Sequence, residues 1–272
     1  MKAARLLVVV AHPDDETFGC GSLLLEALAH GVDSTVVCAT RGEAGEPAPG
    51  SGVTREELGG VRERELRQAA DLMGVGHVEL LGFRDSGMDG EPSTDALVST
   101  PVEAVAREVG GLIQRVRPHV VVTLDASDGH RDHAHIRDAT LRAVEGSSWA
   151  VARVYLQCLP RSLLRRWAEH MHVLQPDSPY LDVDGAGLGT PDALVTDIVD
   201  ATSHLEKRRA AIAIHASQTS PYGQLPPDLE EAFLATNYLR RVVPPDANDG
   251  GTPGIFAGLE LGGVHDCGSS SS

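Results

Sequence analysis

The chain is poor in aromatic residues, cysteines and basic residues, and each scarcity excludes something. Phe, Trp and Tyr make up only 4% of its 272 residues, so the core must be mainly aliphatic. The four cysteines are scattered with no Cys-x-x-Cys pair, which favours buried or idle thiols in a reducing compartment. Lys and Arg number 23 against 39 acids, a formal net charge of −16. This balance disfavours nucleic acid and anionic membranes as partners.

Long hydrophobic runs are also missing. No apolar run approaches the length of a membrane span, and the apolar segment 5–11 leads straight into HPDDE without a cleavage site for a signal peptide. The sequence therefore predicts a cytoplasmic protein. With 42% apolar and 23% charged residues, the composition is that of a globular protein, and the length suits one large domain.

The N-terminal half alternates short β-branched runs with longer amphipathic segments. Buried strands are predicted at 5–11, 33–40, 77–82 and 119–125. Helices are predicted between them, at 21–31, 54–74 and 101–118, with Thr54 and Glu57 as a capping box and Gly74 as a helix stop. Apolar strands separated by helices indicate an α/β fold: a Rossmann-like, mostly parallel sheet with helices on both faces.

The second half has a less regular pattern. A strand is predicted at 152–160, and helices are predicted at 161–172, 202–218 and 228–236. The remainder of the Pro- and Gly-rich stretch 219–254 is predicted to be surface loop. We expect residues 1–150 to form a metal-binding core, 151–262 to form a small irregular C-terminal part of the same domain that covers the substrate site, and 263–272 to be a disordered tail.

The stretch HPDDE at 12–16 places three consecutive acids at the end of a buried strand. Adjacent like charges repel, so stability alone does not explain them. In a parallel sheet, ligands bind beyond the carboxyl ends of the strands. This rule selects four loops, which are also the richest in His, Asp, Glu, Gly and Arg: 12–20, 41–53, 83–93 and 125–134.

His12 and Asp15 have the spacing of a metal-ligand pair. Three residues apart, they project to the same side of a helical turn. Imidazole and carboxylate are common ligands of first-row metals, above all zinc. A second histidine cluster follows another strand: His130, His133 and His135. A solvated pair or a helix cap is the ordinary explanation for any one of these residues, but two clusters after two strands favour a metal site.

Two motifs carry a resemblance to a known family. AHPDDE at 11–16 and GHRDH at 129–133 resemble motifs of the LmbE/PIG-L zinc-dependent deacetylases, which have a Rossmann-like fold and remove acyl groups from N-acylated amino sugars. FRDSGM at 83–88 and TRGEAGE at 40–46 resemble the branch that deacetylates the N-acetylglucosaminyl-inositol precursor of mycothiol or cleaves mycothiol conjugates. HASQ at 215–218 is similar to a stretch of longer bacterial members.

The resemblance implies a role for individual residues. It implies zinc, or iron(II) in its place, held by His12, Asp15 and His133. Asp14 is implied as the general base, and His130 as the group that stabilises the oxyanion or acts as an acid. It also implies substrate contacts for Arg62, Arg84 and Asp85.

The expected activity is hydrolysis of the N-acyl group, most simply acetyl, of a small amino sugar or glycoside by metal-activated water. A mycothiol-conjugate amidase and a non-catalytic sugar-binding protein on the same fold are the alternatives. A metal-dependent phosphoesterase is disfavoured by the acidic loops. The chain departs from the family pattern twice, with Arg131 where a proline is usual and Asp128 where the mycothiol branch has a tyrosine. A homo-oligomer is compatible with the sequence.

Overall fold

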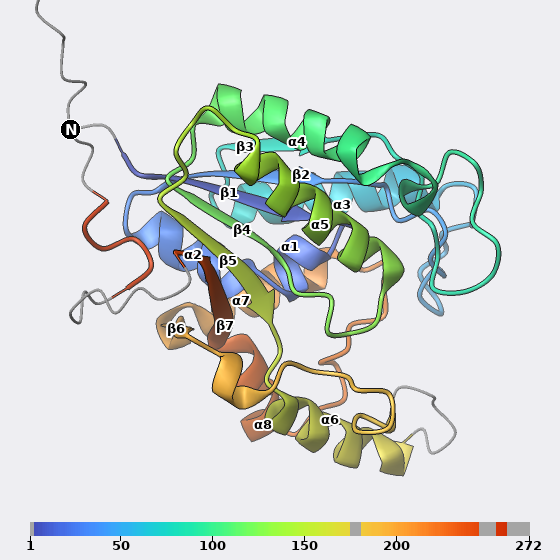
Figure 1. The fold of residues 1–272 in the computed structure, drawn as a ribbon. Helices are drawn as coiled ribbons and strands as arrows, with labels where there is room; N and C mark the ends of the chain where they lie inside the picture. Colours follow the sequence, from blue (N-terminus) through green and yellow to red (C-terminus); the bar gives the residue numbers. More distant parts are fainter. Residues whose placement is uncertain (1–2, 175–180, 245–253, 260–272) are drawn as a thin grey trace, which may run out of the picture.

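A seven-stranded mixed sheet organises the computed structural model, which describes residues 3–174, 181–244 and 254–259 (Figure 1). The strands are β1 (Arg5–Val10), β2 (Asp33–Cys38), β3 (His77–Leu80), β4 (Val120–Leu124), β5 (Arg153–Cys158), β6 (Asp197–Asp200) and β7 (Thr236–Val243). Their order across the sheet is β3-β2-β1-β4-β5-β7-β6. β1 to β5 are parallel, and β7 lies antiparallel between β5 and β6.

Helices cover both faces of this sheet. They are α1 (Asp15–Phe18), α2 (Gly21–Ala29), α3 (Leu58–Leu72), α4 (Val102–Val116), α5 (Arg131–Glu145), α6 (Arg161–Leu174), α7 (Leu205–Ile214) and α8 (Pro227–Leu234). Helices α4 and α5 pack together on one face, and α2, α3 and α7 lie on the other (Figure 1). The predicted α/β fold is confirmed.

The central strands explain why the sheet forms. Residues 6–10 of β1 are completely buried because helices lie on both sides of the strand. Strands in that position need a continuous apolar run rather than an alternating one, and "LLVVV" supplies it. All five strands predicted from such runs are present, each shortened by one to three residues at its ends.

The structure modifies the predicted ends of α3. Thr54 and Glu57 exchange the hydrogen bonds of a capping box, but they do so in a turn, and the helix begins only at Leu58. At the other end, Gly74 adopts a φ of 76° immediately after the helix. That left-handed conformation favours glycine, so the predicted helix stop is confirmed.

The prediction of surface loop around the short helix in 219–254 was wrong for residues 237–243, while 245–253 lie outside the described residues. The short helix α8 is present, but residues 236–243 form β7, an interior strand of the sheet. Asn237 and Leu239 alternate with less buried neighbours, and the Asn237 side chain accepts a hydrogen bond of 2.7 Å from the backbone N–H of Leu23. Two arginines in "TNYLRRVV" weakened the strand pattern. One of them, Arg241, is paired with Asp197 of β6 at 3.0 Å.

Strands β5, β7 and β6 extend the sheet that residues 1–150 begin. The expected role of residues 151–262 as a cover for the site stays a prediction, and the expected tail at 263–272 lies outside the described residues. Within the described ranges, no helix is long and apolar enough to cross a membrane. The cytoplasmic location also stays a prediction.

The role of β7 as an interior strand can be tested by truncating Leu239, whose exposed fraction is 0%. We expect Leu239→Ala to lower the free energy of unfolding by about 2–5 kcal/mol, because the lost side chain leaves a cavity in the core. Ile198→Ala on β6 is the matched control, since this side chain is 66% exposed and its truncation should change stability by less than about 0.5 kcal/mol. Urea unfolding measures both, and equal losses would contradict the placement of β7.

Candidate metal centre

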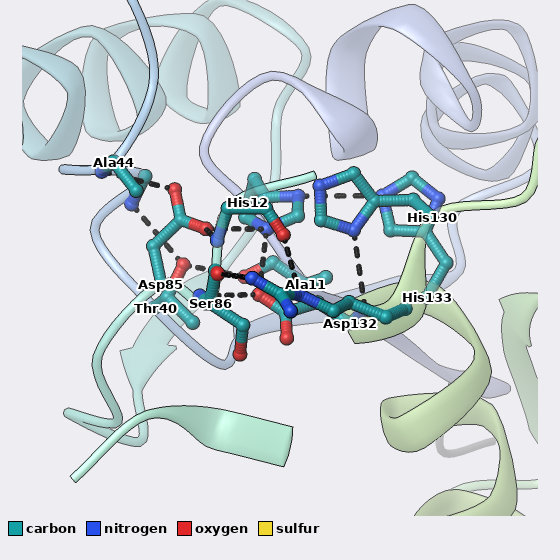
Figure 2. A network of polar contacts seen from close by, with 12 residues as sticks. Ala11, His12, Thr40, Ala44, Asp85, Ser86, His130, Asp132 and His133 are labelled. Atoms are coloured by element: carbon teal, nitrogen blue, oxygen red, sulfur yellow. Dashed lines mark hydrogen bonds and ion pairs between the residues drawn. The ribbon is translucent and has the colours of Figure 1, made fainter. Parts of the chain in front are cut away.

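The candidate site lies where β1 and β4, neighbours in the sheet, end at the same edge. His12 follows β1, and Asp15 opens α1 directly after it. His133 lies in the first turn of α5, which six residues separate from β4, so the loop predicted to extend to 134 ends earlier than expected. Figure 2 shows the histidines of the two segments facing one another.

The three predicted ligands form a small triangle. His12 Nδ1 lies 3.3 Å from His133 Nε2, Asp15 Oδ1 lies 3.4 Å from His133 Nε2, and Asp15 Oδ2 lies 3.6 Å from His12 Nδ1. Ligand atoms about 2.0–2.1 Å from a tetrahedral zinc ion lie roughly 3.3 Å from each other. The structure therefore brings His12, Asp15 and His133 together at spacings close to that value, with Asp15 contributing a different oxygen to each contact, and their role as the ligand set stays a prediction.

A carboxylate stands behind each imidazole. His12 Nε2 lies 3.1 Å from Asp132 and 3.5 Å from Asp85, while His133 Nδ1 lies 2.5 Å from Asp128 (Figure 2 shows the first of these contacts). Such partners keep the proton on the far nitrogen and leave the lone pair of the near nitrogen for a metal. Both rings are thus fixed in the orientation that metal binding requires.

Two sets of three side chains in the described ranges place ligand atoms within 4.8 Å of one another. One set is His12, Asp85 and Asp132, which is fully buried. Its oxygens already accept hydrogen bonds from the backbone N–H groups of Ser86 (3.0 Å) and Gly87 (2.8 Å). Because a catalytic metal needs a position open to substrate, these carboxylates are better explained as partners of the His12 ring.

The other set replaces Asp15 with His130. His130 caps α5, and its Nδ1 accepts a hydrogen bond of 3.1 Å from the backbone N–H of Asp132. With Nδ1 as an acceptor, the neutral ring carries its proton on Nε2 and has no free lone pair there for a metal. Burial and the neighbouring His12 and His133 lower the pKa of His130 to about 4, so the neutral form dominates near pH 7.

Asp14 is held in an unusual backbone conformation. Its φ is 137°, a region that non-glycine residues rarely adopt and that costs about 1–3 kcal/mol. Its N–H donates to Glu16 at 2.9 Å, and its carboxylate lies 3.0 Å from the Arg62 guanidinium. Burial raises the pKa of Asp14 to about 6, against the opposing charge of Arg62.

Arg62 is buried and also donates to the carbonyl oxygens of Pro13 and Gly42, at 2.8 Å each. In the structure it stabilises the Asp14 loop, and its predicted substrate contact stays a prediction. The same holds for Arg84, which is exposed, and for Asp85, which is buried behind His12.

Arg131, the residue in place of the usual proline, binds a whole loop. Its guanidinium donates to the backbone carbonyls of Ser86, Gly87 (2.7 Å), Asp89 (3.1 Å) and Gly90 (2.9 Å). These bonds hold residues 86–90 against α5, next to the hydrogen bond that the Ser86 N–H donates to Asp132. The sequence marks Arg131 as a departure but does not reveal this partner.

Sequence reasoning missed the supporting residues Asp128, Asp132 and Glu16. Glu16 is completely buried and lies 3.0 Å from His215, which connects HASQ to the metal loop. Asp132 stands between two candidate residues in GHRDH, which was the available signal. The sequence alone does not indicate that Asp128 contacts His133. It shows only that Asp128 replaces the tyrosine of the mycothiol branch.

Comparison with known proteins shows which family this chain belongs to. The family PIG-L, described as GlcNAc-PI de-N-acetylase, matches residues 7–144. A protein of Geodermatophilus obscurus named 1D-myo-inositol 2-acetamido-2-deoxy-alpha-D-glucopyranoside deacetylase is 35% identical over 94% of this chain and 98% of its own length. A protein of the same name from Acidothermus cellulolyticus is 31% identical over 98% of this chain and 99% of its own length. The chain belongs to the PIG-L family.

Solved structures share the fold at low identity. N,N'-diacetylchitobiose deacetylase from Pyrococcus horikoshii has a TM-score of 0.58 at 18% identity, with 88% of this chain and 84% of that chain covered. The zinc inhibited form of teicoplanin deacetylase Orf2 has a TM-score of 0.57 at 19% identity, with 88% and 98% covered. The 4-carboxy-2-hydroxymuconate hydratase GalB of Pseudomonas putida KT2440 has a TM-score of 0.59 at 21% identity, with 88% and 96% covered. The predicted family is confirmed, and the hydratase shows that this fold alone does not determine the reaction.

The pH dependence of metal binding tests the PIG-L ligand set. Although burial opposes it, contacts with Asp132 and Asp85 raise the pKa of His12 from 6.5 to about 9 in the metal-free protein. Protonated His12 therefore stabilises the metal-free fold below pH 6.5, and this contribution is lost as the pH rises to about 9. A metal needs the deprotonated ring, so its affinity rises over the same range.

We expect the difference in Tm between zinc-loaded and chelator-treated protein to widen from pH 6.5 to 9, measured by calorimetry at buffered free zinc. His12→Gln should abolish the widening. His30→Gln, at a side chain that is 60% exposed, should retain it. A pH-independent difference would rule out His12 as a ligand.

Proposed function

We propose that this PIG-L protein is a metal-dependent hydrolase that removes the acetyl group from the nitrogen of a small amino sugar or glycoside. The observation that carries the proposal is the grouping of His12, Asp15 and His133, with contacts of 3.3–3.6 Å, beside Asp14, whose backbone φ is 137°. Relatives named as deacetylases of an acetamido sugar support the reaction. We propose zinc as the metal, with iron(II) as the other candidate for the same ligands.

A divalent ion held by these three residues would polarise the substrate carbonyl and lower the pKa of nearby water. Asp14 then acts as the proton acceptor. Its pKa of about 6 leaves it ionised at neutral pH yet close enough to that pH to return the proton to the departing amine. Arg62 keeps the Asp14 carboxylate oriented through the contact of 3.0 Å.

His130 provides a hydrogen-bond donor for the oxyanion. Because its Nδ1 accepts from the backbone, its Nε2 presents an N–H, and a neutral imidazole is sufficient to stabilise developing negative charge. The sequence had suggested a protonated His130, whereas its lowered pKa favours the neutral donor. Proton return to the amine therefore falls to Asp14 alone.

The two alternatives differ in how much of this site they would use. A non-catalytic sugar-binding protein would have no use for a carboxylate held at φ 137°, a conformation with a stability cost. A mycothiol-conjugate amidase would use the same residues on a larger acyl group. A panel of N-acyl sugars and conjugates, screened for free amine by mass spectrometry, separates the last alternative from deacetylation.

Replacing the proposed base tests the mechanism. Asp14→Asn should lower kcat by about 10²–10⁴-fold, because the amide cannot accept the water proton. Bound metal should remain at one equivalent, since Asp14 is not a proposed ligand. Asp138→Asn, at an α5 carboxylate that is 52% exposed, is the control and should keep wild-type kcat. Full activity of Asp14→Asn would exclude it as the base, and loss of metal would indicate a structural role.

Metal removal tests the cofactor. Chelation should abolish amine release, and one equivalent of zinc or of iron(II) under anaerobic conditions should restore it. The metal must be added stoichiometrically to avoid inhibition by excess zinc, because teicoplanin deacetylase Orf2, which has a similar fold, has a zinc inhibited form. Undiminished turnover in metal-free protein, verified by mass spectrometry of the metal content, would overturn the proposal.

A further inference from the structure

We propose that His215 is a positioning residue that acts through Glu16: the pair holds Asp14 in the backbone conformation from which its carboxylate serves as the base. The inference rests on the proposed function, in which Asp14 accepts the proton of the attacking water. His215 follows α7 directly and lies 199 residues from Glu16 in the chain. The contact therefore joins the C-terminal half of the chain to α1, which carries Glu16.

The backbone of Asp14 is held on both sides of its Cα atom. The preceding peptide group is fixed at both ends, because the Pro13 carbonyl oxygen accepts from Arg62 at 2.8 Å and 3.2 Å. The N–H of the same peptide group, that of Asp14, donates to Glu16 at 2.9 Å. On the other side, the Asp14 carbonyl oxygen accepts from the backbone N–H of Thr17 at 2.9 Å. A φ of 137° persists only where such contacts determine it, and Glu16 supplies one of them.

Glu16 can hold that N–H only if its own carboxylate stays in place. The side chain is completely buried, and its two oxygens have different partners. Oε2 accepts from Asp14, while Oε1 accepts from the Thr17 hydroxyl and lies 3.0 Å from His215 Nε2. A buried carboxylate is stable only with hydrogen-bond donors against it. Without the His215 ring, the carboxylate would have to turn toward other donors, and this turn would weaken its bond to Asp14.

Packing alone does not explain a histidine at position 215. The ring is 1% exposed, and within the part of the chain that the structure describes its Nδ1 has no hydrogen-bond partner. It packs edge-on against Phe18, with ring centroids 5.7 Å apart. An apolar side chain would fill this space without a buried polar atom that lacks a partner. The polar contacts that the ring does make, at Nε2 with Glu16 and Thr17, therefore account for it.

The segment that carries His215 is itself anchored to the helix that holds the Asp14 carboxylate. Two residues further on, Ser217 donates to Glu65 of α3 from its backbone N–H at 2.9 Å and from its hydroxyl at 2.5 Å. Arg62, one turn earlier on α3, lies 3.0 Å from the Asp14 carboxylate. Helix α3 thus fixes the carboxylate directly, and it fixes the N–H of the same residue through the segment 215–217 and Glu16. A side chain held in this way can position another precisely.

Replacing His215 separates positioning from packing. In the metal-loaded protein, His215→Leu removes the donor and should lower kcat for amine release by about 10–100-fold, the order of one hydrogen bond to a charged group. KM and the single equivalent of bound metal should not change, because His215 is buried and is not a proposed ligand. His215→Gln places an amide N–H near the position of Nε2 and should restore most of kcat. A lower Tm with wild-type kcat in folded His215→Leu would overturn the proposal.

The other end of α7 provides a matched control. His204 is the N-cap of this helix and lies 3.3 Å from Glu26, so it also pairs a histidine with a glutamate. His204→Leu should keep wild-type kcat, and a comparable fall in this variant would contradict the proposal. Should His215→Leu not fold, His215→Asn takes its place, because the shorter amide reaches only the position of Nδ1. His215→Asn should then have the low kcat, and a kcat equal to that of His215→Gln would refute the assignment.

A double variant tests whether His215 acts through Glu16. If it does, the two losses are not additive, and Glu16→Ala combined with His215→Leu should have the kcat of Glu16→Ala alone within about twofold. Losses that multiply would mean that His215 acts by another route, and they would contradict the proposal.

Hydrogen exchange at the Asp14 amide separates this inference from the proposed function, because it needs no turnover. In zinc-loaded protein isotope-labelled at its aspartate nitrogens, this N–H should exchange at least about tenfold faster in His215→Leu than in wild type. His215→Gln should stay close to wild type, and the Asp138 N–H in α5 is the internal reference for global opening.

The possible outcomes are distinct. Faster exchange at Asp14 alone, together with no amine release even by wild type, would support the positioning role while refuting the deacetylase. Unchanged exchange at Asp14 in folded His215→Leu would refute the positioning role whatever the turnover shows. Equal acceleration at Asp14 and Asp138 would also refute it, because the effect would then be global.

Discussion

The two-sided contacts of the His12 ring are the interaction on which the rest of the site depends. One ring nitrogen faces Asp132 and Asp85, and the other faces His133 (Figure 2). The second nitrogen also lies 3.6 Å from Asp15. The carboxylates behind the ring determine which nitrogen carries the proton, and the ring in turn connects the end of β1 with the start of α5. The 83–90 loop supplies Asp85, and Arg131 ties its residues 86–90 to α5. Three of the four loops selected by the strand-end rule thus meet at one imidazole.

This arrangement brings many carboxylates close together, because His12 and His133 each have carboxylates against them. The acids around the His12 ring have histidines or backbone donors against them, for example Glu16 against His215 and Asp15 against His133. Although burial opposes it, contact with His133 and His12 holds the pKa of Asp15 well below its usual range. Asp14 instead has a raised pKa, because burial outweighs the contact with Arg62. These different partners of two adjacent residues support the proposed roles of Asp15 as a metal ligand and Asp14 as the base.

The sequence predicted those parts of the structure that depend on local pattern. Unbroken apolar runs identified the parallel strands, and the rule for strand ends identified the loops that carry His12 and His133. Strand β7 was missed because its burial alternates and its arginines are compensated by residues far away in the chain, such as Asp197. The sequence also could not predict the contact partners of Asp128 and Arg131. A departure from a motif shows that a contact has changed, but the new contact depends on the path of a second loop.

The two departures have opposite consequences for the chemistry. Arg131 replaces the rigidity of a proline with hydrogen bonds to four carbonyl oxygens, and so it maintains the order of the loop behind His12. Asp128 stands where the resemblance implies a phenol that would assist the substrate carbonyl, and its carboxylate is committed to His133. An ionised carboxylate cannot donate a hydrogen bond to an oxyanion. In the proposed mechanism that task therefore falls to the Nε2–H of His130, whose presence depends on the capping bond between Nδ1 and the first turn of α5. The start of α5 thus positions His133, the proposed metal ligand, and also determines the tautomer of His130, the proposed hydrogen-bond donor to the oxyanion.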